Sequence, residues 1–380
     1  DYAISLVSDR DLSDIDEKLL DVLRLGAHQI FAMNVPNHAS INETVDLANK
    51  VVGKSRGSFA NAIFRNLVKI SDLDKKIDES NFSNIAKLSI KYSHPEWIVQ
   101  SFIDRLGDIG EVELLLAENN NPAKPNLIAW PGKSTKEELL EEGASEINFV
   151  ENGVIANMAP IKYRAIKEKR AGVQDAGSQL LVEIFHRTNI GADLQWLDLC
   201  AAPGGKAKYL YQLLGEKNLQ ANEINPKRFN LLKGLIPSDK LSNFDGRDIS
   251  NFSQKYDRIL IDAPCTGLGA LRRRPEARWR RTPSDLKELV SIQRDLISSS
   301  VKMLNNGGII AYVTCSPHTL ETKAQIADVL RKNKNLELIP ARQYVPIETN
   351  YLENDGTIQM WTHRMGTDSM FMAFLRKHND

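Results

Sequence analysis

Residues 194–207 read LQWLDLCAAPGGKA and combine a short apolar strand, a glycine turn and the start of a helix. From about residue 171 this order of strand, turn and helix repeats toward the end of the chain. Strands that alternate with helices predict an α/β fold with a parallel, doubly wound sheet. The expected strands lie at 194–199, 219–224, 241–245, 256–261 and 308–313, and the expected helices at 204–214, 226–235, 284–304 and 319–332. Two late runs, TIQMWTH at 357–363 and MFMAFLRK at 370–377, are expected to add edge strands, one of them antiparallel.

The length of 380 residues exceeds one ordinary core, so two or three domains are expected. Helical spacing predicts an all-α unit at 1–80, and a mixed pattern predicts a small α+β unit at 81–170 before the sheet domain at 171–380. No apolar run approaches the roughly 20 residues that cross a bilayer, and no signal peptide is visible. The three cysteines indicate a reducing compartment, so we expect a cytoplasmic protein with no membrane partner.

The net charge is zero, but it is unevenly distributed. Residues 1–150 carry 16 Lys and Arg against 24 Asp and Glu, whereas residues 151–380 carry 33 against 25. The densest basic run, RRRPEARWRR at 272–281, interleaves its arginines with Trp279. A solvated loop is the simpler reading of a generic charge run, but arginine clusters also neutralise nucleic-acid phosphates. We expect phosphate contacts from Arg272, Arg273, Arg274, Arg278, Arg280 and Arg281.

Polar residues follow the expected strands, at the edge where a doubly wound sheet binds its ligands. The missing side chains of Gly204 and Gly205 let a ligand approach the main chain, and helix N-terminal amides offer donors. Glu223, Asp245 and Asp262 fall at the ends of the next strands. The dinucleotide fingerprint G-x-G-x-x-G is missing, which weighs against a dehydrogenase. Without a C-x-x-C pair, no metal site is expected.

Two cysteines also follow strands, Cys265 in DAPC at 262–265 and Cys315 in TCS at 314–316. Free cysteines are commonly small buried residues, but two beside Pro or Thr at strand ends of one sheet favour chemistry. C5 of cytosine becomes nucleophilic after a thiolate adds to C6, and it can then take a methyl group from a sulfonium donor. Either cysteine could be this nucleophile, and Asp262 is placed to contact the edge of the ring.

At these residues the sequence resembles the Sun/Fmu (RsmB-type) ribosomal RNA cytosine-5 methyltransferases, which use S-adenosylmethionine. The most specific segments are LDLCAAPGGK, DAPCTGLGALRRRPE and TCS, at 197–206, 262–276 and 314–316. RAGVQDAGSQL at 170–180 and HRMGTDSMFMAFLRK at 363–377 are also similar to the family. The helical start resembles the NusB-like RNA-binding domain that these enzymes carry.

The resemblance implies a Rossmann-like class I methyltransferase domain behind a NusB-like domain. The resemblance implies that Cys315 is the covalent nucleophile and that Cys265 assists product release. It also implies that the partner is small-subunit ribosomal RNA, either naked or in an early assembly intermediate. We expect a monomer. The implied S-adenosylmethionine contacts are Cys200, Ala201, Ala202, Pro203, Gly204, Gly205, Lys206, Glu223, Asp245 and Asp262. The sequence departs from the family at Ala207, Glu223 and Phe244, and Asp248 is an alternative to Asp245.

Other functions remain open at this stage: a transfer RNA cytosine-5 methyltransferase, a catalytically silent ribosome-assembly module and a protein methyltransferase. Intact Asp262, Cys265 and Cys315 argue against a silent module, and protein methylation would need neither thiol. The NusB-like start favours ribosomal over transfer RNA, by analogy.

Overall fold

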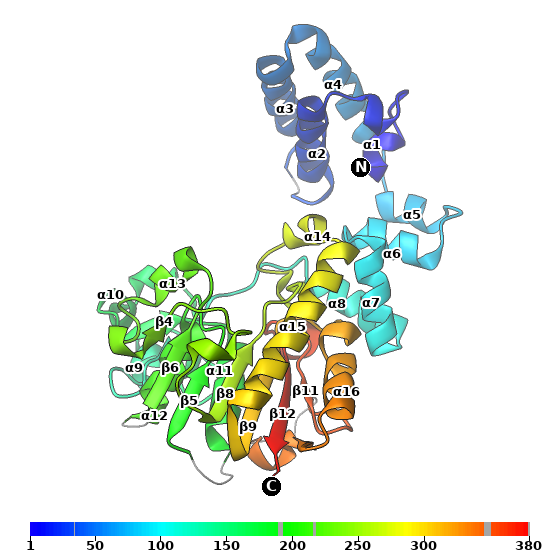
Figure 1. Ribbon diagram of the computed structural model, residues 1–380. Helices are drawn as coiled ribbons and strands as arrows, with labels where there is room; N and C mark the ends of the chain where they lie inside the picture. The colour runs from blue at the N-terminus through cyan, green and yellow to red at the C-terminus, as the bar shows by residue number, and fades with distance from the viewer. Residues whose placement is uncertain (34, 189–192, 216–217, 346–350, 379–380) are drawn as a thin grey trace. The chain divides into compact units, whose positions relative to one another are not determined.

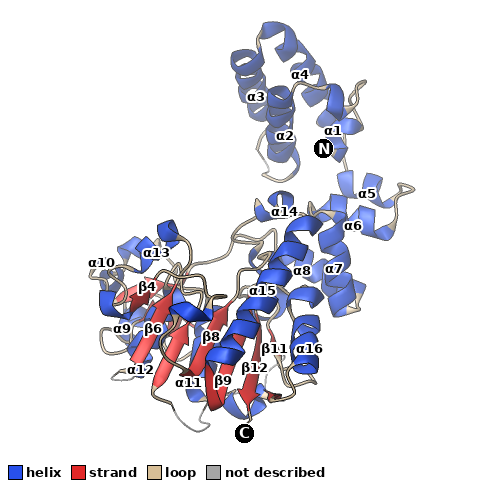
Figure 2. Cartoon of the chain, viewed as in Figure 1, coloured by secondary structure: helices blue, strands red, loops and turns tan. Residues whose placement is uncertain are grey.

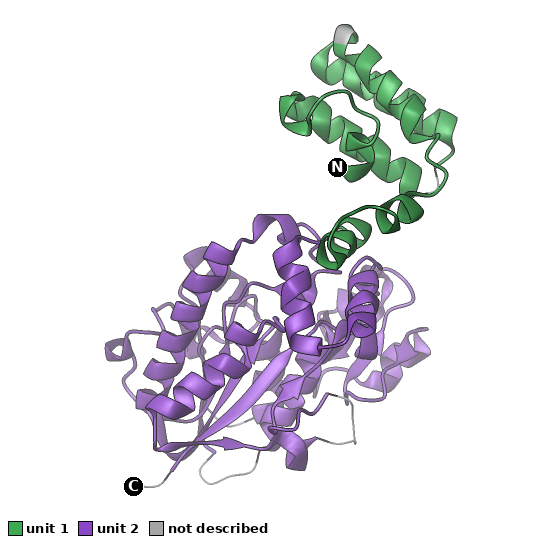
Figure 3. Cartoon of the chain, turned by 90° about the vertical axis from the view of Figure 1, so that its right-hand side faces the viewer, with its two compact units in different colours: residues 1–93 green, residues 94–380 purple. Residues whose placement is uncertain are grey.

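The computed structural model describes residues 1–33, 35–188, 193–215, 218–345 and 351–378 (Figure 1). The chain divides into two compact units, Asp1–Ser93 and His94–Asp380 (Figure 3). The boundary between these units falls inside the segment 81–170, and the division into three domains stays a prediction.

The smaller unit is helical, as the spacing of its apolar residues predicts. Asp16 caps α2 by accepting a hydrogen bond from the Leu19 amide at 3.2 Å. Gly26 lets α2 pack closely against α4, because a Cβ atom there would lie 2.3 Å from the Phe64 ring. The elements of this unit are α1 (Tyr2–Ser5), η1 (Leu12–Asp14), α2 (Glu17–Phe31), α3 (Asn37–Val52), α4 (Lys54–Leu67), α5 (Leu73–Asp78) and α6 (Asn84–Tyr92).

The larger unit begins with two helices and a four-stranded antiparallel sheet in the order β2-β3-β1-β4. Ile128 of β1 and Trp130, which follows β1, share one hydrophobic core with Leu180 and Leu181 of α11 (Ala176–Arg187). This shared core joins the small sheet to the part of the chain that follows it. The elements are α7 (Glu96–Leu106), α8 (Ile109–Glu118), β1 (Asn126–Ala129), α9 (Lys136–Glu141), β2 (Ser145–Glu146), β3 (Gly153–Ile155), η2 (Pro160–Lys162), α10 (Arg164–Lys167) and β4 (Ala171–Val173).

The main sheet has the order β10-β12-β9-β8-β5-β6-β7, with β11 paired to β12. Pairing is parallel from β7 through β9 and antiparallel from β9 through β12 to β10. The strands are β5 (Gln195–Asp198), β6 (Asn218–Asn222), β7 (Leu241–Ser242), β8 (Tyr256–Asp262), β9 (Leu304–Thr314), β10 (Leu336–Ile339), β11 (Ile358–Gln359) and β12 (Phe371–Lys377). The helical elements are α12 (Gly205–Leu214), α13 (Pro226–Leu232), η3 (Ser238–Lys240), η4 (Ile249–Asn251), η5 (Leu268–Ala270), α14 (Ala277–Arg280), α15 (Pro283–Met303), η6 (Thr319–Glu321), α16 (Lys323–Lys332), η7 (Ala341–Tyr344) and α17 (Thr362–Met365).

Helices cover both faces of this sheet (Figure 2). Successive strand residues point to opposite faces. Leu260 of β8 packs into the core that contains α11 and α12, whereas Ile259 and Ile261 pack with α15 and α16. The predicted doubly wound architecture is confirmed, because this continuous burial on both faces is typical of parallel strands between helices.

The expectation of edge strands at the C-terminus is wrong for residues 370–377. β12 is an interior strand, hydrogen-bonded to β9 on one side and to β10 on the other. Its partner β10 was not among the expected strands. Pairing between distant segments is a tertiary property, and an apolar run shows burial without showing which neighbours provide it. No helix among the described residues is long and apolar enough to cross a membrane.

Candidate active site

The glycine turn after β5 is built from backbone conformation. Gly204 has a φ of 114°, a left-handed value that favours glycine, and it caps α12. A Cβ atom at this position would also lie 2.6 Å from Leu235 Cδ1. The peptide between Ala202 and Pro203 is cis. The turn places the first amides of α12, which lack helical partners, at the carboxyl end of the sheet.

Acidic residues end the neighbouring strands, as predicted. Glu223 follows β6, is buried, and accepts a hydrogen bond from the Asn225 amide at 2.9 Å. Asp198 ends β5, and neither of its oxygens makes a hydrogen bond of regular geometry to the described residues. Burial, followed by the nearby charge of Asp262, raises the pKa of Asp198 to about 8. Asp198 therefore holds a proton more readily than an exposed aspartate, a property that sequence reasoning did not indicate.

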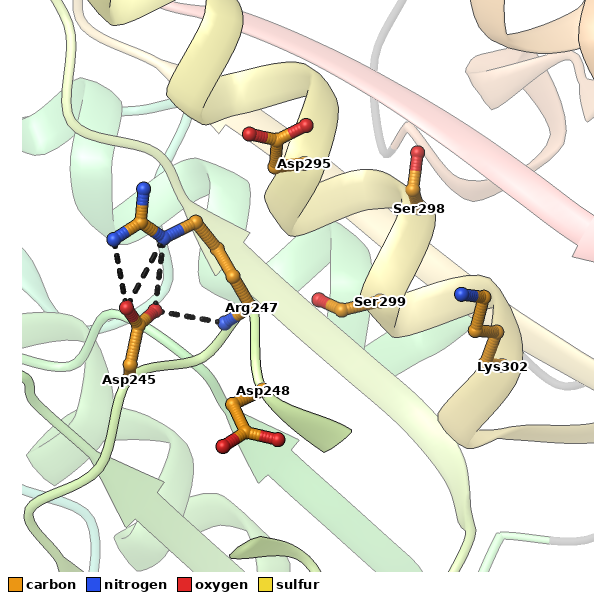
Figure 4. A pocket seen from close by; sticks show the side chains of 7 residues that line it. All are labelled: Asp245, Arg247, Asp248, Asp295, Ser298, Ser299 and Lys302. Carbon is orange, nitrogen blue, oxygen red and sulfur yellow. Dashed lines mark hydrogen bonds and ion pairs between the residues drawn. The ribbon is translucent and has the colours of Figure 1, made fainter. Parts of the chain in front are cut away.

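Asp245 and Asp248 line a hollow of about 590 Å³ beside α15 (Figure 4). Asp245 forms an ion pair with Arg247 at 2.7 Å. The Asp248 carboxylate instead accepts hydrogen bonds from the Ser250 amide and hydroxyl, at 3.0 and 2.7 Å. Both carboxylates thus have local partners. The ligand contact stays a prediction for Asp245, with Asp248 as the alternative.

Lys206 and Asp262 form a partly buried ion pair, with Nζ 2.8 Å from Oδ2. Burial lowers the pKa of Lys206, but the charge and the hydrogen bond of Asp262, together with the charge of Cys315, raise it by more. The pKa of Lys206 therefore lies above its usual value. Lys206 comes from the first turn of α12 and Asp262 from the end of β8. The ion pair therefore connects the glycine turn to the DAPC loop.

The structure brings two of the three cysteines together. Cys265 Sγ lies 3.2 Å from Cys315 Sγ, although the residues are 50 positions apart in sequence. The hydrogen bond with Cys315, burial and the charges of Cys315 and Glu321 raise the pKa of the Cys265 thiol. The pKa of Cys200 is also raised, first by burial and then by Asp198. Cys265 and Cys200 are thus held as protonated thiols.

Three of the six predicted RNA-contacting arginines make bonds inside the protein. Arg272, with a mostly buried side chain, donates to the backbone carbonyl that follows α17. Arg273 forms a two-pronged ion pair with Asp368, with one of its distances 2.8 Å. Arg278 is buried and donates to the carbonyl of Asn119 at 2.7 Å. These three side chains hold the segment after the DAPC loop against the larger unit.

The other three arginines of the run point outward to different degrees. Arg274 and Arg280 are exposed, and Arg281 is half-buried. Trp279 between them is 67% exposed. This part of the run combines positive charge with a free aromatic face, the two features that bind single-stranded nucleic acid.

Sequence reasoning missed a buried polar network behind the thiols, formed by Thr266, Gln293, Tyr312, Ser316 and Glu321. Thr266 and Ser316 lie within the quoted motifs, but their partners come from α15, β9 and η6 and approach them only in the folded protein. In the described ranges, no group of three or more His, Cys, Asp or Glu side chains could hold a metal ion.

Comparison with known proteins identifies two regions. Residues 189–376 match the family model described as 16S rRNA methyltransferase RsmB/F, and residues 1–69 match the NusB family. A Mycobacterium tuberculosis protein, named only provisionally as a methyltransferase, is 35% identical over 395 residues, covering 99% of this chain and 84% of that protein. The ribosomal RNA small subunit methyltransferase B of Vibrio vulnificus is 28% identical, over 86% of this chain and 79% of its own length.

The fold has solved counterparts as well. A methyltransferase homologue from Pyrococcus horikoshii superposes with a TM-score of 0.64 at 19% identity, over 78% of this chain and all of that one. At this identity the match concerns the fold alone.

Proposed function

Because this chain belongs to the RsmB/F family of 16S rRNA methyltransferases, we propose that it methylates C5 of a cytosine in small-subunit ribosomal RNA. The observation that carries the proposal is the pair of thiols 3.2 Å apart, beside the Lys206–Asp262 ion pair. A methyl transfer to a heteroatom or to a protein side chain needs neither thiol. Addition to C6 of a pyrimidine and later release need a nucleophile and a partner close to it.

Cys315 is the nucleophile in this proposal. The family resemblance gives this role to the cysteine of the Thr-Cys motif, and the Lys206 ammonium group interacts electrostatically with this residue. Addition of the Cys315 thiolate to C6 makes C5 an enamine carbon. Asp262 contacts the N3/N4 edge of the ring and stabilises the adduct. After methyl transfer, solvent takes the C5 proton as base, the C5–H electron pair re-forms the C5–C6 double bond, and the C6–sulfur bond breaks to return the Cys315 thiolate.

Cys265 assists the release. It remains a protonated thiol, and its Sγ lies within hydrogen-bonding distance of the sulfur that must leave. An S–H group that donates to Cys315 stabilises the departing thiolate, so Cys265 is needed for turnover more than for attack.

The glycine turn and the strand-end acids fit S-adenosylmethionine. When bound, it supplies an electrophilic methyl group. The amides at the start of α12 and the main chain of Cys200–Lys206 would hold its polar end, since these amides lack helical partners. Buried Glu223 would bond the ribose hydroxyls and Asp245 the base. The Asp198 oxygens, which make no hydrogen bond of regular geometry to the described residues, would be available to a polar group of the ligand.

The RNA would reach this site with its target base unpaired or flipped out, because C6 is inaccessible to a thiol in a stacked helix. All six arginines of the run stay candidates for phosphate contacts, and Arg274, Arg280 and Arg281 are favoured because Arg273, although exposed, is paired with Asp368. The internal hydrogen bonds of Arg272, Arg273 and Arg278 would hold in place the segment that carries these arginines. Trp279 offers its exposed face for stacking on a base.

Trapping experiments with single cysteine variants test the two thiol roles. Cys265→Ala should still attack but release slowly, so it should accumulate a protein–RNA adduct that survives denaturation. Cys315→Ala, its matched control, should form none. An adduct from Cys315→Ala and none from Cys265→Ala would reverse the assignment.

A further inference from the structure

A buried carboxylate lies behind the two thiols and takes no part in the chemistry described so far. Glu321 in η6 is fully buried. It accepts hydrogen bonds from the Thr266 amide at 2.9 Å, the Gln293 side-chain amide at 3.0 Å and the Thr266 hydroxyl. All three donors are neutral. A buried carboxylate is costly unless several donors stabilise it, so this arrangement indicates a built polar centre.

The network reaches the residue that follows each cysteine. Thr266 follows Cys265 and Ser316 follows Cys315, and their hydroxyl oxygens lie 3.1 Å apart. The single Thr266 hydroxyl proton goes to Glu321, so Ser316 must be the donor in the contact with Thr266. Ser316 Oγ in turn accepts the His318 amide at 3.2 Å. The Glu321 carboxylate, which can only accept, therefore sets the direction of the hydrogen bond from Ser316 to Thr266.

Gln293 of α15 closes the network around the DAPC loop. Its amide nitrogen donates to the Pro264 carbonyl at 2.9 Å as well as to Glu321. Its oxygen accepts from the Tyr312 hydroxyl at 3.0 Å, and the same hydroxyl lies 2.8 Å from the Glu321 carbonyl. Residues on both sides of Cys265 are thus tied to one buried carboxylate.

We propose that Glu321 is a positioning residue of the two-thiol site: acting through Thr266 and Ser316, it holds Cys265 Sγ within hydrogen-bonding distance of Cys315 Sγ so that product can be released. The inference rests on the proposed function, because it assigns Glu321 to the release step. Its charge also contributes, after the bond to Cys315 and burial, to keeping Cys265 protonated.

The test compares Glu321→Gln with the pair Thr266→Val and Thr266→Ser. Glutamine keeps the shape of Glu321 but presents an amide group where the carboxylate accepted hydrogen bonds. Valine removes the Thr266 hydroxyl, whereas serine retains it. Loss of one such buried bond changes a rate by about tenfold. We therefore expect turnover on protein-free small-subunit ribosomal RNA to fall about tenfold in Glu321→Gln and Thr266→Val, with the trapped adduct rising per enzyme molecule. Thr266→Ser should stay close to wild type.

The adduct separates positioning from simple structural support. Misfolding lowers turnover and adduct together, whereas a defect in release lowers turnover and raises the adduct. If Glu321→Gln and Thr266→Val show wild-type turnover, or lose adduct in proportion to turnover, the positioning role is overturned. If Glu321→Gln does not fold, the serine and valine variants decide, and equal behaviour of these two contradicts the proposal. Cys265→Ala on the same gel keeps the proposals apart: adduct from that variant shows that the two-thiol chemistry stands even where the Glu321 role fails.

Discussion

At the scale of single residues, the two thiols differ in the charges around them. Lys206 interacts with Cys315, and Glu321 acts on Cys265. The hydrogen bond with Cys315, burial and the nearby charges of Cys315 and Glu321 raise the pKa of the Cys265 thiol, which suits Cys265 to donate a hydrogen bond rather than to attack. The sequence placed both cysteines at strand ends but could not show this difference. Glu321 belongs to no recognisable motif, and its partners lie 28 and 55 positions away.

Another buried carboxyl group gives a prediction for stability. Burial raises the pKa of Glu183 from 4.5 to about 7, although the Tyr209 hydroxyl donates to it at 2.7 Å and opposes the change. Between these pH values only the folded protein holds the proton, so stability falls as pH rises through the window. Wild type should therefore lose up to roughly 3 kcal/mol relative to Glu183→Gln between pH 4.5 and 7, and nothing more at higher pH. Urea unfolding of both proteins across this range checks it. Parallel stability curves would contradict it.

At the scale of elements, the strands could be predicted well and their neighbours could not. Continuous apolar runs at 194–199 and 256–261 correspond to β5 and β8, because strands buried on both faces leave a strong composition signal. β12 has the same signal, but its place between β9 and β10 depends on pairing with segments far away in sequence. The internal partners of the arginine run could not be predicted for the same reason. Arg273 and Arg278 find partners 95 and 159 positions away.

The helix that carries Gln293 provides a prediction at this scale. α15 begins with a capping box in which Thr282 accepts the Asp285 amide at 3.3 Å and Asp285 accepts the Thr282 amide at 2.8 Å. Thr282→Ala should lower the free energy of unfolding by about 1 kcal/mol, because an orphan amide loses its acceptor. Thr282→Ser keeps the acceptor and should lose far less. Urea denaturation monitors both variants, and equal losses would show that the cap hydroxyl contributes nothing.

At the scale of the whole molecule, positive charge is concentrated in the part of the chain that holds the thiols. Residues 151–380 carry 33 Lys and Arg against 25 Asp and Glu, and 1–150 carry 16 against 24. Part of the excess is used internally, as Arg272 shows. Net charge counted along a sequence therefore overstates the charge available to RNA, and the exposed half of the arginine run is the part to test.

Replacing Arg274, Arg280 and Arg281 together with Ala should weaken binding to small-subunit ribosomal RNA. The slope of log affinity against log salt should become shallower by about 2, since each lost phosphate contact removes about 0.7 on a single strand. Arg331→Ala is a matched control, because Arg331 is also exposed but pairs with Asp328 on α16. Binding titrations at several salt concentrations measure the slope. Equal slopes for the triple variant and wild type would remove these arginines from the interface.

The most direct test of the two-thiol mechanism is methyl transfer from labelled S-adenosylmethionine to protein-free small-subunit ribosomal RNA, with wild type and Cys315→Ala side by side. Label is expected at C5 of cytosine with wild type, and none is expected with Cys315→Ala. Equal labelling by the two proteins, or label at any atom other than C5 of cytosine, would contradict it.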